Sequence, residues 1–133
     1  MKKGWLIFIL LTLVIITGCS SKESLINRID IDFPEGEDKM IVEEETIHQF
    51  STIWETIEKK QGEEKPDDNE SVKLTLFIST DSNKPERLYE FSIWFTDVGA
   101  SIWDHENEGL GTLEIDESKE LQNILENNSK PGI

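Results

Sequence analysis

In the stretch Val72-Lys73-Leu74-Thr75-Leu76-Phe77-Ile78-Ser79, aliphatic residues occupy every second position. Alternation with a period of two predicts a β-strand that turns one face toward a core. Residues Tyr89–Phe95 repeat the alternation, and we expect two shorter strands at residues 100–103 and 110–115. The turns that separate these strands are Asp81–Pro85, Asp97–Gly99 and Asn107–Gly109. Consecutive strands joined by short turns predict an antiparallel meander.

The flanking sequence adds one strand and two helices to this meander. Residues Leu25–Phe33 alternate like a half-buried strand, and Pro34–Asp38 ends it. Apolar residues at three- and four-residue spacing predict a helix over residues 43–60. The apolar stripe of this helix is Ile47, Phe50, Ile53, Trp54 and Ile57. A short C-terminal helix around Leu121, Ile124 and Leu125 has Asp116 or Ser118 as its candidate cap.

Together these elements predict an α+β fold with one antiparallel sheet of about five strands and both helices on one face. A single domain over residues 25–128 and a C-terminal tail at 129–133 are expected. Phe50, Leu76, Phe91 and Ile93 should form part of the core between the sheet and the helices.

The N-terminal residues have the pattern of a signal peptide and not of a folded domain. Lys2 and Lys3 precede the apolar run Trp5–Ile16, which is shorter than the roughly 20 residues of a spanning helix. The run leads into Ile16-Thr17-Gly18-Cys19, which contains the only cysteine of the chain. This pattern resembles the lipobox of bacterial lipoproteins, with Ile16 where leucine is most common.

The resemblance implies that a diacylglyceryl group is attached to Cys19 and that a peptidase cuts between Gly18 and Cys19. Residues 1–18 would then be a removed signal peptide, and residues 19–24 a lipidated tether. The five residues after Cys19 span at most roughly 15–18 Å. The layout is similar to that of small lipoproteins of Gram-positive bacteria, which implies a location on the outer face of the cytoplasmic membrane. No cofactor is expected apart from the covalent lipid.

The charge of the mature chain restricts its partners. Removing residues 1–18 takes away two lysines and no acid, which leaves 11 basic and 28 acidic residues and a net charge of −17. This balance argues against nucleic acid and against electrostatic attraction to anionic lipids. A cationic extracytoplasmic protein or a cell-wall polymer would suit it, although such a charge also serves solubility. No cysteine remains for a disulfide, a thiol nucleophile or a cysteine zinc site.

One segment has part of the spacing of a calcium loop. The weak metal candidates are Asp104, His105, Glu106 and Glu108, but the twelfth position is Ile115 instead of a bidentate acid. A solvated hairpin turn is the alternative interpretation. His48 and His105 would suit zinc or copper only if the fold brought them together. The chain contains no nucleophile elbow, phosphate loop or HExxH motif, and we therefore expect a protein that is not an enzyme.

The aromatic residues suggest a binding surface. Phe77 and Trp94 fall on the strand faces opposite the predicted core, and Trp103 would join them in one of the two registers of its strand. These residues would form a partner face unless a loop or the C-terminal helix covers them. We therefore expect a non-enzymatic binding or interaction module. The alternatives are an inhibitor or immunity-type lipoprotein directed against a secreted enzyme, and a metal- or cell-wall-associated accessory protein.

Overall fold

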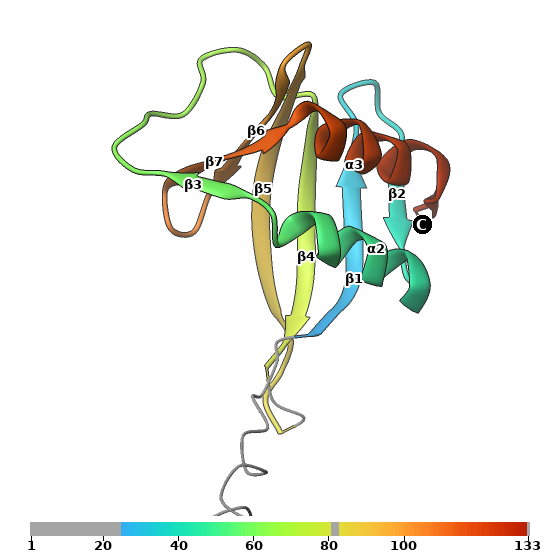
Figure 1. Ribbon diagram of the computed structural model, residues 1–133. Helices are drawn as coiled ribbons and strands as arrows, with labels where there is room; N and C mark the ends of the chain where they lie inside the picture. The colour runs from blue at the N-terminus through green and yellow to red at the C-terminus, as the bar shows by residue number, and fades with distance from the viewer. Residues whose placement is uncertain (1–24, 81–82, 133) are drawn as a thin grey trace, which may run out of the picture.

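The computed structural model describes residues 25–80 and 83–132, which form one antiparallel sheet covered on one face by two helices (Figure 1). The predicted signal peptide, Cys19 and the predicted tether lie outside the described residues. The sheet has eight strands in the order β3-β7-β6-β5-β4-β1-β2-β8. The strands are β1 (Leu25–Asp32), β2 (Asp38–Ile41), β3 (Glu58–Lys60), β4 (Val72–Ser79), β5 (Arg87–Thr96), β6 (Gly99–Asp104), β7 (Gly109–Glu114) and β8 (Lys130–Pro131). The helices are α2 (Glu44–Trp54) and α3 (Ile115–Asn127).

The α+β class and the four-strand meander are confirmed, but the expected number of about five strands is wrong. The three additional strands, β2, β3 and β8, are only two to four residues long. The expected tail contributes one of them, because Lys130–Pro131 pairs with β2 at the edge of the sheet. Such short segments carry no periodicity of their own, and their pairing partners define them.

Helix α2 is much shorter than the predicted helix over residues 43–60. It ends at Trp54, where Glu55 caps it and the Thr56 hydroxyl donates a 2.6 Å hydrogen bond to the Ile53 carbonyl. Residues 58–60 then run as an edge strand along β7. Helix α3 begins at Ile115, and its N-cap is Glu114, which forms no side-chain cap hydrogen bond, so the prediction of Asp116 or Ser118 as the cap is wrong.

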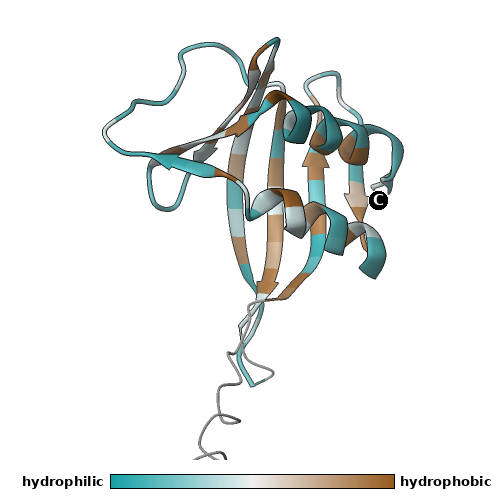
Figure 2. Ribbon diagram, viewed as in Figure 1, coloured by the Kyte–Doolittle hydropathy of each residue, from teal (hydrophilic) through white to brown (hydrophobic). Residues whose placement is uncertain are grey.

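The core lies between the sheet and the helices. Phe50, Leu76 and Ile93 are buried as predicted, whereas Phe91 is half-buried against Trp54. The other large buried apolar side chains are Ile29, Ile31, Ile41, Leu74, Leu121 and Leu125. Figure 2 shows that the inward-facing parts of both helices are hydrophobic, while the 61–70 loop is hydrophilic. Within residues 25–80 and 83–132, no helix is long and apolar enough to cross a membrane.

Candidate functional site

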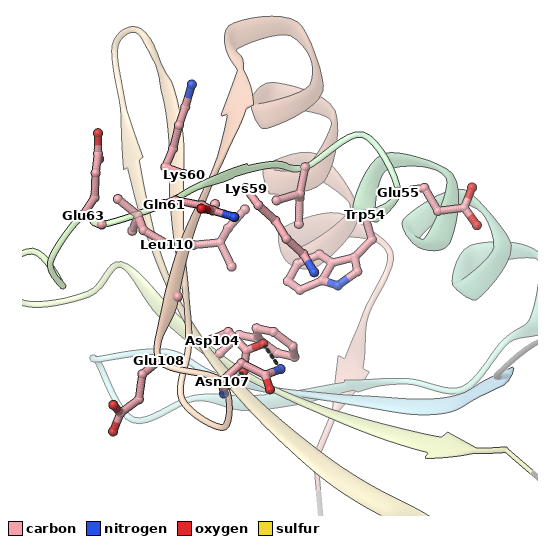
Figure 3. A pocket seen from close by; sticks show the side chains of 16 residues that line it. Trp54, Glu55, Lys59, Lys60, Gln61, Glu63, Asp104, Asn107, Glu108 and Leu110 are labelled. Carbon is pink, nitrogen blue, oxygen red and sulfur yellow. Dashed lines mark hydrogen bonds between the residues drawn. The ribbon is translucent and has the colours of Figure 1, made fainter.

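A half-open cleft of about 780 Å³ lies on the helix-covered face, between the end of α2, strand β3 and the β6–β7 hairpin (Figure 3). Its volume falls within the range of about 300–1,000 Å³ that is usual for ligand pockets. The lining residues are Trp54, Glu55, Ile57, Lys59, Lys60, Gln61, Gly62, Glu63, Phe91, Ile102, Asp104, Asn107, Glu108, Gly109, Leu110 and Gly111. The surface of the cleft is more apolar than polar, and the charged groups of Glu55, Glu63 and Glu108 lie toward its rim.

Two glycines make the floor of this cleft. Alternate residues of β7 face the helices, and by register these are Gly109, opposite Asp104, Gly111, opposite Ile102, and the buried Leu113, opposite Ala100. A β-carbon at Gly111 would collide with the Cγ2 methyl of Ile57, so this glycine lets the segment after α2 pack closely on the strand. A β-carbon at Gly109 would meet nothing within 4 Å. The cleft is therefore hollow where a strand would ordinarily present a side chain.

An aromatic wall stands beside this floor. The indole of Trp54 stacks on Phe50 with ring centroids 4.9 Å apart and meets Phe91 edge-on at 5.0 Å. Phe50 is fully buried and supports Trp54 from the core, whereas Trp54 is itself only half-buried. Within the described part of the chain, the indole N–H of Trp54 has no hydrogen-bond partner. The wall thus presents a rigid aromatic surface and one free donor.

The polar side chains of the cleft divide into two groups (Figure 3). Lys59 and Asn107 point toward the hollow, together with Asp104. The carboxylate of Asp104 accepts hydrogen bonds from the backbone N–H of Glu106 at 3.0 Å and from the side-chain amide of Asn107 at 2.8 Å. Lys59 forms no ion pair with any residue that the structure describes. The inward groups are therefore one free cation and a carboxylate–amide pair held by the hairpin turn.

The acids of the rim are oriented differently. Glu55, Glu63 and Glu108 point away from the hollow in Figure 3, and all three are exposed. Lys60 also points outward and lies 3.7 Å from the carboxylate of Glu58. The cleft consequently has a weakly charged interior within an acidic margin.

The predicted partner face is not an open aromatic surface. Trp94 is only 6% exposed, because the 61–70 loop crosses it and the Asp68 carbonyl accepts a 2.9 Å hydrogen bond from its indole N–H. The expectation of an exposed ring is therefore wrong for Trp94, and the loop alternative is confirmed. Trp103 and Phe77 are half-buried, and the Arg28 guanidinium lies 5.1 Å above the Phe77 ring. The three aromatic residues do not form one surface.

The metal candidates are spread over the β6–β7 turn. His105 accepts or donates a 2.7 Å hydrogen bond with the buried Ser92 hydroxyl, and Glu106 pairs with Arg87 at 3.3 Å. Glu108 closes the turn with a φ of 51°. His48 lies on α2, on the other side of the sheet from the Ser92–His105 contact, so the fold does not bring the two histidines together. Over residues 25–80 and 83–132, no group of three or more potential ligands is arranged to hold a metal ion.

One carboxyl group outside the cleft has a perturbed pKa. Asp32 and Asp38 are directly opposite each other on β1 and β2. Partial desolvation raises the pKa of Asp32, and the hydrogen bond and like charge of Asp38 raise it further, while Lys73 acts in the opposite direction. This pair lies on the open side of the sheet, away from the cleft.

Two glycines in strand β7 could have indicated the cleft from the sequence. Gly109-Leu110-Gly111 places two glycines on one face of a strand, and glycine within a strand often marks a close approach of backbone or ligand. Trp54, in contrast, was indistinguishable from an ordinary core residue of the helix stripe. Comparison of the chain with protein-family models, with curated proteins and with solved structures finds no match.

Proposed function

We propose that this chain is a lipoprotein held at the outer face of the cytoplasmic membrane by a diacylglyceryl group on Cys19, and that its folded domain is a non-enzymatic binding module. The lipobox-like sequence Ile16-Thr17-Gly18-Cys19 supports the anchor. The observation that carries the binding function is the open space over Gly109, because it lies in an aromatic-walled cleft beside a well-packed core.

The interior of the cleft favours a neutral ligand with a flat apolar face and several hydrogen-bonding groups. Trp54 offers a supported ring and a free N–H, while Asn107 and Lys59 add donors that point inward. Pockets of this kind bind the body of a ligand by apolar contact and orient it with a few polar groups. The sugar rings of a cell-wall glycan have this combination, and such a polymer lies in the compartment that the anchor implies.

The margin of the cleft favours a second candidate. The exposed carboxylates of Glu55, Glu63 and Glu108 carry no ion pair within the described residues, and the mature chain has a net charge of −17. A cationic protein would be attracted to this rim, as an inhibitor or immunity-type lipoprotein requires of its target enzyme. The two candidates therefore depend on different residues of one cleft.

The anchor is tested by replacing Cys19. The Cys19→Ala precursor should take up no fatty acid label and should be processed abnormally. Equal incorporation of labelled fatty acid by the wild type and the variant would contradict the anchor.

The cleft is tested by filling it. Gly109→Leu places a side chain in the open space without deleting a contact, and Thr112→Leu adds similar bulk to the opposite face of the same strand. In calorimetric titrations with the disaccharide repeat of the cell wall, Gly109→Leu should weaken binding at least ten-fold, or about 1.4 kcal/mol. Thr112→Leu should bind like the wild type, provided that both variants melt cooperatively.

The charge of the rim separates the two candidates. A variant with Glu55, Glu63 and Glu108 changed to Gln should retain glycan binding and lose salt-dependent capture of cationic proteins. If this variant lost glycan binding while Gly109→Leu bound the glycan normally, the glycan would not bind in the interior of the cleft.

A further inference from the structure

A small apolar patch lies at the end of the sheet where β1 begins and β4 ends; Figure 1 shows these two strand ends side by side. Leu25 is 63% exposed and Leu88 is 58% exposed, although both are large hydrophobic residues. They flank strand β4, because Leu25 pairs with Ser79 and Leu88 pairs with Phe77. We call Leu25, Phe77 and Leu88 the tether-end patch; Figure 2 shows hydrophobic ribbon where β1 begins and β4 ends.

The charge around the tether-end patch differs from that of the whole chain. The described cations near it are Arg28, Lys84 and Arg87, and the described acids are Asp30, Glu86 and Glu106. Arg28 pairs with Asp30 at 2.6 Å, and Arg87 pairs with Glu106 at 3.3 Å. Counted over the described residues, this end has three cations and three acids, while the mature chain carries 17 surplus negative charges. It is an end of the domain that can approach an anionic surface without a large electrostatic cost.

The length of the tether decides which surface lies within reach. Leu25 follows the five tether residues Ser20–Ser24, which span at most roughly 15–18 Å. A lipid on Cys19 thus confines the start of β1 to the immediate neighbourhood of the bilayer. The opposite end of the sheet lies about 30 Å away, because β5 runs ten residues from Arg87 to Thr96.

We propose that the tether-end patch rests on the bilayer, with Leu25 and Leu88 in the headgroup region and the balanced cations Arg28 and Arg87 beside them. This proposal rests on the lipid anchor proposed above and is independent of the ligand of the cleft. Two leucines would be too weak to recruit a free protein. Here the anchor makes the contact intramolecular, so the effective concentration of the bilayer is high and a weak patch is sufficient. The docked domain has a fixed orientation, with the β5–β6 turn directed away from the membrane.

The test uses the full lipidated protein in vesicles of phosphatidylcholine and phosphatidylglycerol. Leu88→Cys and Val98→Cys each introduce a thiol for an environment-sensitive fluorophore, since the native cysteine is blocked by lipid. Val98 is the matched control, because it is 85% exposed and lies in the β5–β6 turn. A spin label on the phospholipid acyl chain should quench the fluorophore at position 88 at least several-fold more than the fluorophore at position 98.

The mass of the same sample shows whether Cys19 carries the diacylglyceryl group, so that each quenching result tests either the docking or the anchor. If the mass includes the diacylglyceryl group and the two positions are quenched equally, the docking proposal is overturned while the anchor stands. If the diacylglyceryl group is missing from Cys19, the anchor fails and the docking proposal falls with it. Stronger quenching at position 88 in the lipidated protein supports the proposed orientation. A cooperative melt of both labelled variants excludes unfolding as the cause.

Discussion

The two halves of the sheet use the same strand pattern in different ways. In the filled half, β4, β1 and β2 present Leu74, Leu76, Ile29 and Ile41 to the helices, and all four are essentially inaccessible to solvent. In the open half, β3, β7, β6 and β5, the corresponding face of β7 carries Gly109 and Gly111, and only Leu113 of this strand joins the core. The comparison shows that the cleft is open where β7 lacks a side chain at Gly109, whereas Ile57 fills the space over Gly111.

The largest expected effect concerns the support that the two halves share. Phe50 is fully buried and stacks on Trp54, the wall of the cleft. Phe50→Ala should reduce the free energy of unfolding by about 3–5 kcal/mol, because it removes contacts and leaves a cavity. Phe91→Ala, in the open half, should cost clearly less because Phe91 is already half-exposed to the cleft. Urea denaturation midpoints measure both values, and equal losses would mean that the open half is packed as tightly as the filled half.

The next effect tests the two glycines against each other. Gly111→Ala should destabilise the domain by about 1–3 kcal/mol, because the new methyl group collides with the stiff, β-branched side chain of Ile57. Gly109→Ala adds the same methyl group to open space and removes backbone freedom from the unfolded chain. It should therefore be neutral or stabilising by up to about 1 kcal/mol. Urea denaturation midpoints measure both changes in stability. If Gly109→Ala lowered the free energy of unfolding as much as Gly111→Ala, the space over Gly109 would not be open.

The filled half was predictable from the sequence, and the reason is physical. Strands β1 and β4 are each eight residues long, so their alternation of apolar and polar positions repeats several times. Helix α2 likewise shows its buried stripe through Ile47, Phe50 and Ile53. Each of these elements buries one whole face, and the buried face requires apolar residues at regular spacing in the sequence.

The open half was not predictable in the same way. Ile57 continues the three- and four-residue spacing of α2, but the helix ends at Trp54 and Ile57 packs on Gly111 instead. The pairing of residues 58–60 with β7 is a long-range interaction that overrides local spacing. The indole N–H of Trp94 donates to a backbone carbonyl, that of Asp68, and no pattern of side chains indicates such a partner. The sequence therefore predicted the packed scaffold and missed the residues that open the cleft.

A smaller effect concerns the loop that covers the other face of the open half. Trp94→Phe keeps an aromatic ring but removes the N–H that donates to the Asp68 carbonyl. The loss should reduce stability by about 0.5–1.5 kcal/mol, the usual net value of one hydrogen bond. A glutamate-specific protease should also cut faster at Glu63 and Glu64 in the released loop. Trp103→Phe is the control, and equally fast cleavage in both variants would contradict the role of the hydrogen bond.

The smallest expected effect lies in the filled half, at the pair Asp32 and Asp38. The pKa of Asp32 is raised in the folded protein, so the folded state holds this proton more tightly than the unfolded state, in which the pKa is near 3.9. Below the pKa of the unfolded state, Asp32 is protonated in both states, and the repulsion between Asp32 and Asp38 does not lower the free energy of unfolding. As the pH rises through the raised pKa of the folded state, Asp32 becomes charged and the free energy of unfolding falls. Asp32→Asn should therefore melt slightly higher than the wild type at neutral pH, and this advantage should vanish in acid. Asp32 is exposed, so the gain should be a small fraction of that lost in Phe50→Ala. Thermal melts across this pH range measure the difference, and an Asn variant that melts lower at neutral pH would show that the attraction of Lys73 outweighs the repulsion of Asp38.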